Sequence, residues 1–304
     1  MTRGIKKILF VVSLSLCSVF IGHSIINAAD GTKQSITVSP VKETFELNSG
    51  EEATRKITVI NSGETDYDFR LYVLPFSVHG EEYSQAFAEA PNAPSAANWI
   101  SFPVEKFHVS AGEKVEASYN VAVDKNAPSG GHYATVFAET IPPESTTNGV
   151  TTVKRIGTIL YFEIKGDITR SGSVDSFTAN RIQSAKPISS TLRLTNDGNV
   201  HYPANGTLTL KNVLNRREYT ETFSGMVLPS TTRKFDRSWQ NAKLLGLYKV
   251  SGSVDILGQQ NNLGTQWIIY LPLKQVLIVI AILLAFIVLA IILYKRKRHI
   301  ISGR

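Results

Sequence analysis

An uninterrupted run of 19 apolar residues, 276–294, ends directly before the basic cluster Lys295, Arg296, Lys297 and Arg298. An α-helix needs about 20 apolar residues to cross the ~30 Å hydrocarbon core of a bilayer. The run therefore predicts one transmembrane helix. Lysine and arginine beside such a helix stay in the cytoplasm, so these four residues are expected to determine its topology.

The first 29 residues have the features of a secretory signal peptide. Three basic residues, Arg3, Lys6 and Lys7, precede a shorter apolar stretch, and the small pair Ala28-Ala29 follows it. Asn27 is unfavourable three positions before a cut after Ala29, so an uncleaved anchor is the alternative. Both ends together predict a single-pass protein of the cell membrane, with its N-terminal part outside the cytoplasm and a basic cytoplasmic tail at 295–304.

Aromatic residues flank the predicted helix on both sides. Trp267 and Tyr270 precede it, and Tyr294 is its last residue. Tryptophan and tyrosine are enriched where a membrane protein passes the lipid headgroups. We therefore expect these three side chains at the membrane interface.

The positive net charge of the chain is concentrated at its two ends. Of the 32 lysine and arginine residues, three lie in the signal region and five in the tail, which leaves 24 against 25 acidic residues in between. A nucleic-acid partner would need a basic excess on the folded part, so none is predicted. Cys17, in the signal region, is the only cysteine. The exported part must therefore fold without disulfides, by its hydrophobic core alone.

Alternating apolar and polar residues dominate the chain from Ser35 onward, with many β-branched and aromatic residues between Asn, Gly, Pro and Ser clusters. This pattern predicts an all-β region made of sandwich domains. The clearest predicted strands are 55–60, 68–73, 115–123, 133–139, 153–164, 191–195, 207–210 and 248–256.

The chain also repeats itself. An alternating strand ends in Asn-x-Gly at Asn61 and again at Asn196, and two further landmarks follow each copy in the same order. We predict two tandem immunoglobulin-like β-sandwiches, 35–168 and 173–271, and a positive φ at Gly63 and Gly198 in the two turns. Pro, Ser and Thr residues at 142–149 predict a mobile hairpin tip.

The first copy contains extra chain at 75–107, which breaks the strand pattern and is rich in Ala and Pro. One interpretation is a long loop or short helix that caps the sandwich end. The other is a binding loop, because loops on rigid sandwiches often carry recognition. On that interpretation Tyr83, Phe87 and Trp99 are candidate ligand-binding residues for stacking on sugar faces. Trp99 has the alternative role of a core residue.

Motifs for catalysis or metal binding are missing from the sequence. It contains no H-E-x-x-H arrangement, G-x-S-x-G elbow, G-x-G-x-x-G turn or P-loop, and no exported cysteine. We predict a protein that is not an enzyme, with no catalytic residues, no metal and no cofactor.

The order of parts resembles the WxL-interacting protein family of Gram-positive-type cell surfaces. The resemblance is carried by Ile36-Thr37-Val38-Ser39-Pro40, by 55–61, by Asn98-Trp99-Ile100 leading to 109–123, by 127–133 and by 157–164. It implies a peptidoglycan-binding immunoglobulin-like domain, a second such domain that binds a surface protein, and one C-terminal membrane helix. The segment 41–47 is shorter than the family's usual opening, and the second domain matches less well than the first.

The resulting prediction is a membrane-anchored cell-surface binding protein that attaches to peptidoglycan, to surface proteins or to both. One alternative is an extracytoplasmic chaperone or assembly factor that acts by β-strand addition. A second is an accessory subunit of a membrane complex. The predicted helix contains no charged residue and no G-x-x-x-G pair, which gives little support to specific helix pairing.

Overall fold

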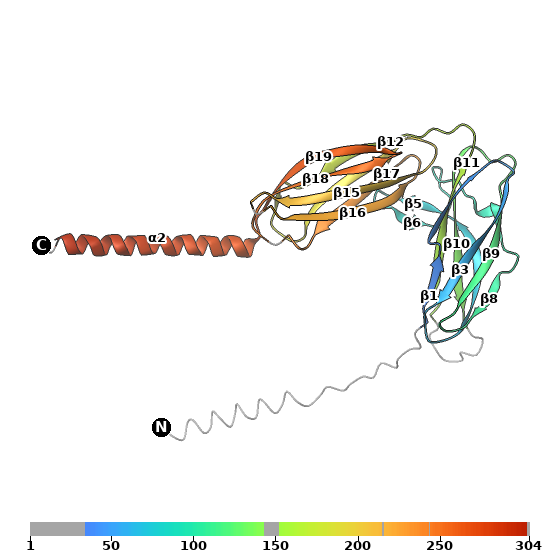
Figure 1. The fold of residues 1–304 in the computed structure, drawn as a ribbon, viewed down its shortest axis with the longest axis horizontal. Coiled ribbons are helices and arrows are strands. Elements are labelled where there is room, and N and C mark those ends of the chain that lie inside the picture. The colour runs from blue at the N-terminus through green and yellow to red at the C-terminus, as the bar shows by residue number, and fades with distance from the viewer. Residues whose placement is uncertain (1–33, 143–151, 215, 243, 303–304) are drawn as a thin grey trace, which may run out of the picture.

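The computed structural model of the protein describes residues 34–142, 152–214, 216–242 and 244–302, and omits the side chains of 292 and 294–302. The predicted signal peptide and nearly all of the predicted hairpin tip at 142–149 lie outside the described residues. The described chain forms two β-sandwiches followed by one helix (Figure 1).

The first sandwich packs a four-stranded sheet, in the order β1-β3-β9-β7, against a five-stranded sheet, in the order β2-β11-β10-β4-β8. Its core lies between these sheets, where the rings of Phe45 and Phe162 stack with their centroids 4.5 Å apart. The strands are β1 (Ile36–Ser39), β2 (Lys42–Leu47), β3 (Glu52–Asn61), β4 (Tyr67–Pro75), β7 (Ile100–Ser101), β8 (Lys106–Val109), β9 (Lys114–Ala122), β10 (Gly130–Ile141) and β11 (Arg155–Ile164).

The second sandwich packs a three-stranded sheet, in the order β12-β14-β17, against a five-stranded sheet, in the order β13-β19-β18-β15-β16. Trp239, Tyr248 and Tyr270 are among its buried residues. The strands are β12 (Gly172–Thr178), β13 (Ile182–Gln183), β14 (Ile188–Asn196), β15 (Tyr202–Asn212), β16 (Glu218–Val227), β17 (Thr231–Trp239), β18 (Gly246–Ile256) and β19 (Gln259–Tyr270).

Apart from β7, which belongs to the extra chain, the two sandwiches have the same strand order, which confirms that the chain contains two copies of one immunoglobulin-like module. In each copy the chain enters one sheet as its edge strand, β1 or β12, and then crosses to the other sheet, where β2 or β13 pairs in parallel with the last strand of its copy. The predicted strands at 55–60, 115–123 and 191–195 fall within β3, β9 and β14, apart from the final residue of 115–123.

The repeated Asn-x-Gly segments have the same local geometry in both copies. The side chain of Asn196 is buried and donates to the carbonyl oxygens of Val200 and Val227, each at 2.9 Å, and its Oδ1 accepts from the N–H of Gly198. Asn61 makes the equivalent bonds in the first copy. In both turns, one buried amide closes the connection between two strands.

The expectation of positive φ at the two turn glycines was wrong. The glycines with positive φ lie at other positions, such as Gly112 and Gly166. Gly198 is required for space instead, because a Cβ there would lie 2.3 Å from the carbonyl oxygen of Thr169 in the linker. The turn itself is held by the Asn196 amide, so it needs no left-handed residue.

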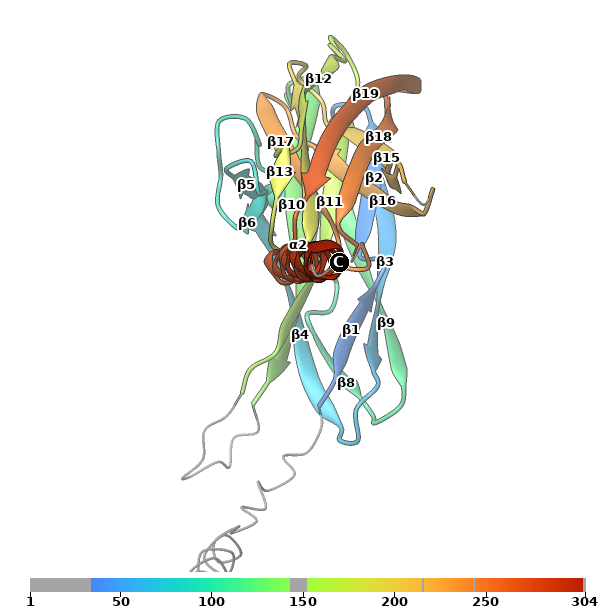
Figure 2. The ribbon, with the colours of Figure 1, turned by 90° about the vertical axis from the view of Figure 1, so that its left-hand side faces the viewer.

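The extra chain of the first copy connects β4 to β8, and it is not a plain loop. It forms the short hairpin of β5 (Ser77–His79) and β6 (Ser84–Ala86), the 3₁₀ turn η1 (Ala97–Trp99) and the strand β7. The hairpin reaches the second sandwich and lies beside the ends of β16 and β17 (Figures 1 and 2). Its strands are too short to produce a periodic sequence pattern.

A single helix, α2 (Leu273–Ser302), follows the second sandwich. Its segment Leu273–Ile291 has a mean hydropathy of 2.8 and is not buried against the rest of the described chain, so by length and composition it is able to span a membrane. Only Leu271 and Pro272 separate it from β19. The helix continues the long axis of the second sandwich, while the first sandwich stands at an angle to both (Figure 1).

Candidate functional site

Tyr83 lies between the two sandwiches and is 9 % exposed. Its hydroxyl oxygen accepts a hydrogen bond of 3.0 Å from the backbone N–H of Leu228 and forms a second bond with the hydroxyl of Thr231. Burial raises the pKa of the Tyr83 hydroxyl. The structure therefore places this predicted ligand-binding residue in an interface within the chain, with its polar group already occupied.

An arginine of the second sandwich completes the surroundings of Tyr83. The guanidinium carbon of Arg233 lies 4.6 Å from the centroid of the Tyr83 ring, and Nη1 of Arg233 donates to the carbonyl oxygen of Met226 at 2.6 Å. Desolvation lowers the pKa of Arg233, and the tyrosine face offsets part of that cost through a cation–π contact. Gly225 leaves room for this side chain, since a Cβ there would lie 2.6 Å from Nη1.

The tip of the β5–β6 hairpin caps the outer edge of β17. The carbonyl oxygen of Glu81 accepts a hydrogen bond of 2.8 Å from the backbone N–H of Lys234. The carboxylate of Glu81 pairs with Nε of Arg193 at 2.6 Å, and that of Glu82 pairs with Nζ of Lys234 at 2.7 Å. The extra chain of the first sandwich thus covers a sheet edge of the second.

An aromatic cluster continues this interface towards the linker. It contains Phe76, Tyr83, Tyr133 and Tyr161 from the first sandwich and Met226 and Leu228 from the second. The Tyr133 hydroxyl lies 3.3 Å from Nδ1 of His201, and the Tyr161 ring packs on the same imidazole. Burial, with a smaller contribution from Arg170, lowers the pKa of His201 to about 4. The interface therefore holds a neutral histidine at physiological pH.

Phe87 and Trp99, the other two candidate ligand-binding residues, are both partly buried. Phe87 packs edge-on against Phe137, with the ring centroids 4.7 Å apart. Trp99 packs against the core of the first sandwich, 4.7 Å from the ring of His132, as its alternative role required. Phe87 packs against the interdomain cluster that contains Tyr83, whereas Trp99 packs against a different core, so the three rings form no common platform. Sugar stacking by these residues stays a prediction.

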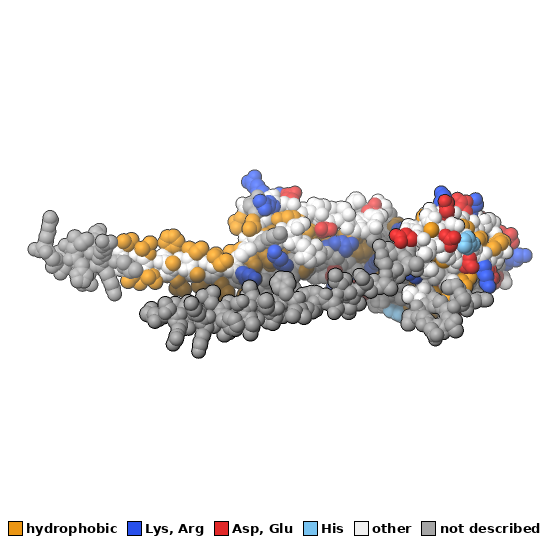
Figure 3. Space-filling view, turned by 90° about the horizontal axis from the view of Figure 1, so that it is seen from below, with side chains coloured by type: hydrophobic (Ala, Val, Ile, Leu, Met, Phe, Trp, Pro, Cys, Tyr) orange, Lys and Arg blue, Asp and Glu red, His pale blue; other side chains and the backbone are white. Residues whose placement is uncertain are grey.

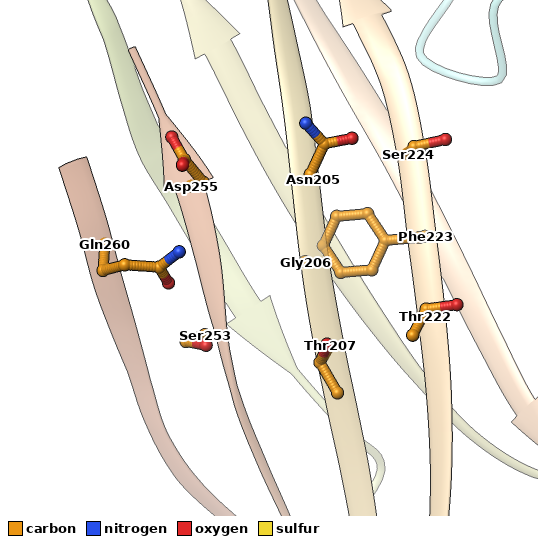
Figure 4. Close-up of a pocket in the computed structure, with 9 residues that line it drawn as sticks. All are labelled: Asn205, Gly206, Thr207, Thr222, Phe223, Ser224, Ser253, Asp255 and Gln260. Atoms are coloured by element: carbon orange, nitrogen blue, oxygen red, sulfur yellow. The ribbon is translucent and has the colours of Figure 1, made fainter. Parts of the chain in front are cut away.

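A second candidate site is the outer face of the five-stranded sheet in the second sandwich. A shallow, open pocket there is lined by side chains of four neighbouring strands (Figure 4). In the sheet register Asn205 lies between Ser224 and Asp255, with Gln260 beyond Asp255, and Thr207 lies between Thr222 and Ser253. A neighbouring pocket continues the same face to Thr209, Ser251 and Thr265.

The chemistry of this face is uniform. Apart from Asp255, its outward side chains are hydroxyls and amides, which both donate and accept hydrogen bonds without carrying charge. The ring of Phe223 also lines the pocket, but it belongs to the buried core of the sandwich. Asp255 itself accepts a bond of 2.8 Å from the backbone N–H of Gly258 in the β18–β19 turn. Such a surface is suited to binding a neutral ligand that is rich in hydroxyl groups. Among the described residues, no group of three or more His, Cys, Asp or Glu side chains could hold a metal ion.

The three residues predicted at the membrane interface have different surroundings in the structure. Trp267 is 52 % exposed on β19, close to the start of α2. Tyr270 is 1 % exposed and packs edge-on against Tyr248, because alternate residues of β19 face the core and the surface. The side chains of Tyr294 and of the basic residues Lys295, Arg296, Lys297 and Arg298 lie outside the described part of the structure, although their backbone is helical.

Comparison with known proteins finds matches only among solved structures. No known family model matches the sequence, and no curated protein matches it. Solved structures that resemble the chain include the chaperone–tip adhesin pre-assembly complex of Csu pili from Acinetobacter baumannii, with 17 % identity over 78 % of this chain and 99 % of that one, at a TM-score of 0.39.

Two further examples are chaperone structures. The CupB2 chaperone of Pseudomonas aeruginosa is 13 % identical over 77 % of this chain and 100 % of its own, at a TM-score of 0.38. The structure of the Salmonella enterica SafA pilin in complex with the SafB chaperone is 12 % identical over 77 % of this chain and 96 % of that chain, at a TM-score of 0.37. At these values the likeness carries no argument about function.

Proposed function

We propose that this chain is a membrane-anchored surface protein that acts by binding, and that the outer face of the five-stranded sheet in its second sandwich contacts a neutral glycan of the cell wall. The observation that carries the proposal is the set of hydroxyl and amide side chains aligned across β16, β15, β18 and β19. The helix α2 attaches this sandwich to the membrane, and the pocket lies towards the other end of the sheet, beside the turn between β18 and β19.

The shape of the site supports a polymer rather than a small ligand. Small-molecule sites bury most of the ligand in a concave and largely apolar cavity. This pocket is open and polar and continues along the sheet, so an extended chain of sugars would contact several rows of side chains at once. Sugar hydroxyls donate and accept hydrogen bonds as the serine, threonine, asparagine and glutamine side chains do.

The resemblance to WxL-interacting proteins implies that the first sandwich binds the wall, whereas the present proposal places the binding face on the second sandwich. One experiment tests both assignments. The experiment is co-sedimentation of the full-length protein, kept in detergent, with purified insoluble peptidoglycan. A double substitution, Asn205→Ala with Gln260→Ala, removes two amides from the pocket. Two lost hydrogen bonds are worth about 1–3 kcal/mol, which corresponds to a loss of affinity of about fivefold to about 150-fold.

The matched control is Gln240→Ala with Asn241→Ala, which removes the same two residue types from an exposed turn after β17. It is expected to bind as the wild type does. If wild-type protein stays in the supernatant, wall binding is excluded. If all three proteins sediment equally, the wall is bound elsewhere, and Phe87→Ala then tests the first sandwich.

A second candidate function is β-strand addition, as in a chaperone or assembly factor. The observation that favours it is an open sheet edge: β7 pairs with β9 only at Asn120 and Val121, so nothing in a named strand pairs with the outer side of residues 114–119 in the described structure. A client strand would pair with these backbone groups, and side-chain substitutions would matter little.

A proline tests this second candidate. Ser118→Pro removes one donor from the open edge of β9, whereas Ser118→Ala keeps it. Binding of an unfolded surface protein, measured by suppression of its aggregation, should fall only with the proline. Equal suppression by both variants would exclude strand addition at β9.

A further inference from the structure

We infer that the end of the second sandwich next to α2 is a membrane-binding surface that lies in the headgroup layer of an anionic lipid bilayer. This inference rests on the membrane anchor in the proposed function and adds a second contact, made by the sandwich itself. We call this surface the membrane-facing end and define it by Arg181, Ile182, Lys186, Leu214, Arg216, Leu244, Trp267, Ile269, Leu273 and Lys274.

The connection between sandwich and helix leaves almost no distance to the bilayer. Tyr270 ends β19 and Leu273 begins α2, and two intervening residues span at most ~7 Å. The first turn of the helix is also bound to the sandwich, because the side-chain oxygen of Gln275 accepts a hydrogen bond of 2.8 Å from the N–H of Leu245. Once the helix spans a membrane, this end of the sandwich must face its surface.

Large apolar side chains are exposed at this end. The segments that meet there are the residues around β13, the turn after β15, the turn before β18 and the last part of β19. The exposed fractions are 64 % for Ile182, 76 % for Leu214, 46 % for Leu244, 52 % for Trp267, 44 % for Ile269 and 68 % for Leu273. Six such side chains therefore lie at one end of the sandwich, and a concentration of exposed apolar residues of this kind marks an interaction site.

Basic side chains surround these apolar residues. Arg181, Lys186, Arg216 and Lys274 are all exposed, and Glu218 is the only acidic residue in segments 181–187, 211–218, 240–249 and 265–275. Glu218 is paired with Lys211. Figure 3 shows lysine and arginine side chains beside apolar ones near the start of the helix, whereas acidic side chains are most numerous over the first sandwich.

The combination of exposed apolar and basic side chains favours a lipid surface over a protein partner. Exposed leucine, isoleucine and tryptophan enter the boundary between headgroups and acyl chains, and lysine and arginine are attracted to anionic headgroups. The apolar helix that starts within the same surface places a bilayer there without any further partner. The second sandwich would therefore stand upright on the membrane, with little freedom to tilt.

The test uses single cysteines that carry an environment-sensitive fluorophore, introduced into the full-length protein with Cys17→Ser. Leu214→Cys and Leu244→Cys report on the membrane-facing end. Leu257→Cys is the matched control, because Leu257 is an exposed leucine in a hairpin turn at the opposite end of the same sandwich. Ile287→Cys reports on the helix. The protein is reconstituted in vesicles of phosphatidylcholine and phosphatidylglycerol that contain a spin-labelled lipid quencher.

The expected result is strong quenching at residues 214, 244 and 287 and none at residue 257. Quenching at 214 and 244 is expected to weaken severalfold in phosphatidylcholine alone. Quenching at 287 without quenching at 214 and 244 would overturn the membrane-facing end while keeping the anchor. Absence of quenching at 287 would instead overturn the anchor and thus the proposed function. Blue-shifted but unquenched emission at 214 would mean that protein, such as a second copy, covers this end.

Discussion

The hydroxyl group of Tyr83 makes two polar contacts between the sandwiches, with Leu228 N–H and with the hydroxyl of Thr231. The Tyr83→Phe substitution keeps the ring and its contact with Arg233 but leaves the buried Leu228 N–H without an acceptor. We expect a loss of about 1–3 kcal/mol in the free energy of unfolding, measured with urea. Tyr219→Phe is the control on the partly buried surface of β16 and should change stability by less than about 0.5 kcal/mol. Equal effects would show that the hydroxyl is not structural.

His201 should make the interface sensitive to acid. Its pKa is lowered to about 4 in the folded protein, whereas a histidine in an unfolded chain titrates near about 6.5. Between these values the unfolded chain binds the extra proton, so stability falls as the pH falls. We expect His201 to contribute about 2 kcal/mol to the stability lost between about pH 7 and about pH 5.

The measurement is urea unfolding at the two pH values for wild type, His201→Phe and His79→Gln. His201→Phe should lose less stability on acidification than the wild type does. His79→Gln changes an exposed histidine of the β5–β6 hairpin and should behave as the wild type. The same loss in all three proteins would contradict a role for His201.

At the scale of secondary-structure elements, the β5–β6 hairpin protects a sheet edge. β17 pairs with β14 on one side, and on the other its Lys234 N–H binds the Glu81 carbonyl. The ion pairs of Glu81 and Glu82 are partly exposed, so water screens them and each contributes little to stability. The hairpin therefore acts mainly by burying the ring of Tyr83 in the interface and by covering the edge of β17.

Replacement of residues 77–86 by a Gly-Ser segment of equal length should expose β17 and cause aggregation through edge pairing. Light scattering and the amide I infrared band measure it. A proline at residue 234 tests the cause, because the Lys234 N–H points away from β14 and is not needed within the sheet. Lys234→Pro in the hairpin-less protein should suppress aggregation, and unchanged aggregation would contradict edge pairing as its cause.

The strands and the repeat were predictable from the sequence, whereas the interface was not. Apolar and polar residues alternate along 248–256, and this pattern can be read from neighbouring positions in the sequence alone. The inward residues of β18 all face the same core. Tyr83 contacts Leu228 and Thr231, which lie far along the chain, and nothing in its short hairpin indicates which surface it covers. The alternation of inward and outward residues continues to the end of β19. It predicts that Trp267 and Tyr270 lie on opposite faces of the strand, one exposed and the other buried.

At the scale of the whole molecule, the two sandwiches are joined by more than their linker. The aromatic cluster, the hairpin and the bonds of Asn199 to the linker segment 167–169 all connect them. The sequence predicts two modules that fold separately, at 35–168 and 173–271, and that prediction stays open. The structure adds a continuous path from the first sandwich, through the second, to α2 (Figure 1).

The central claim is that α2 anchors both sandwiches on the outer side of a membrane. Its most direct test is protease added to intact cells that express the full chain with one epitope tag in the turn at Gly258 and a second after Arg304. We expect the first tag to be degraded and the second to be protected until detergent is added. Protection of both tags, or degradation of the second in intact cells, would contradict the claim.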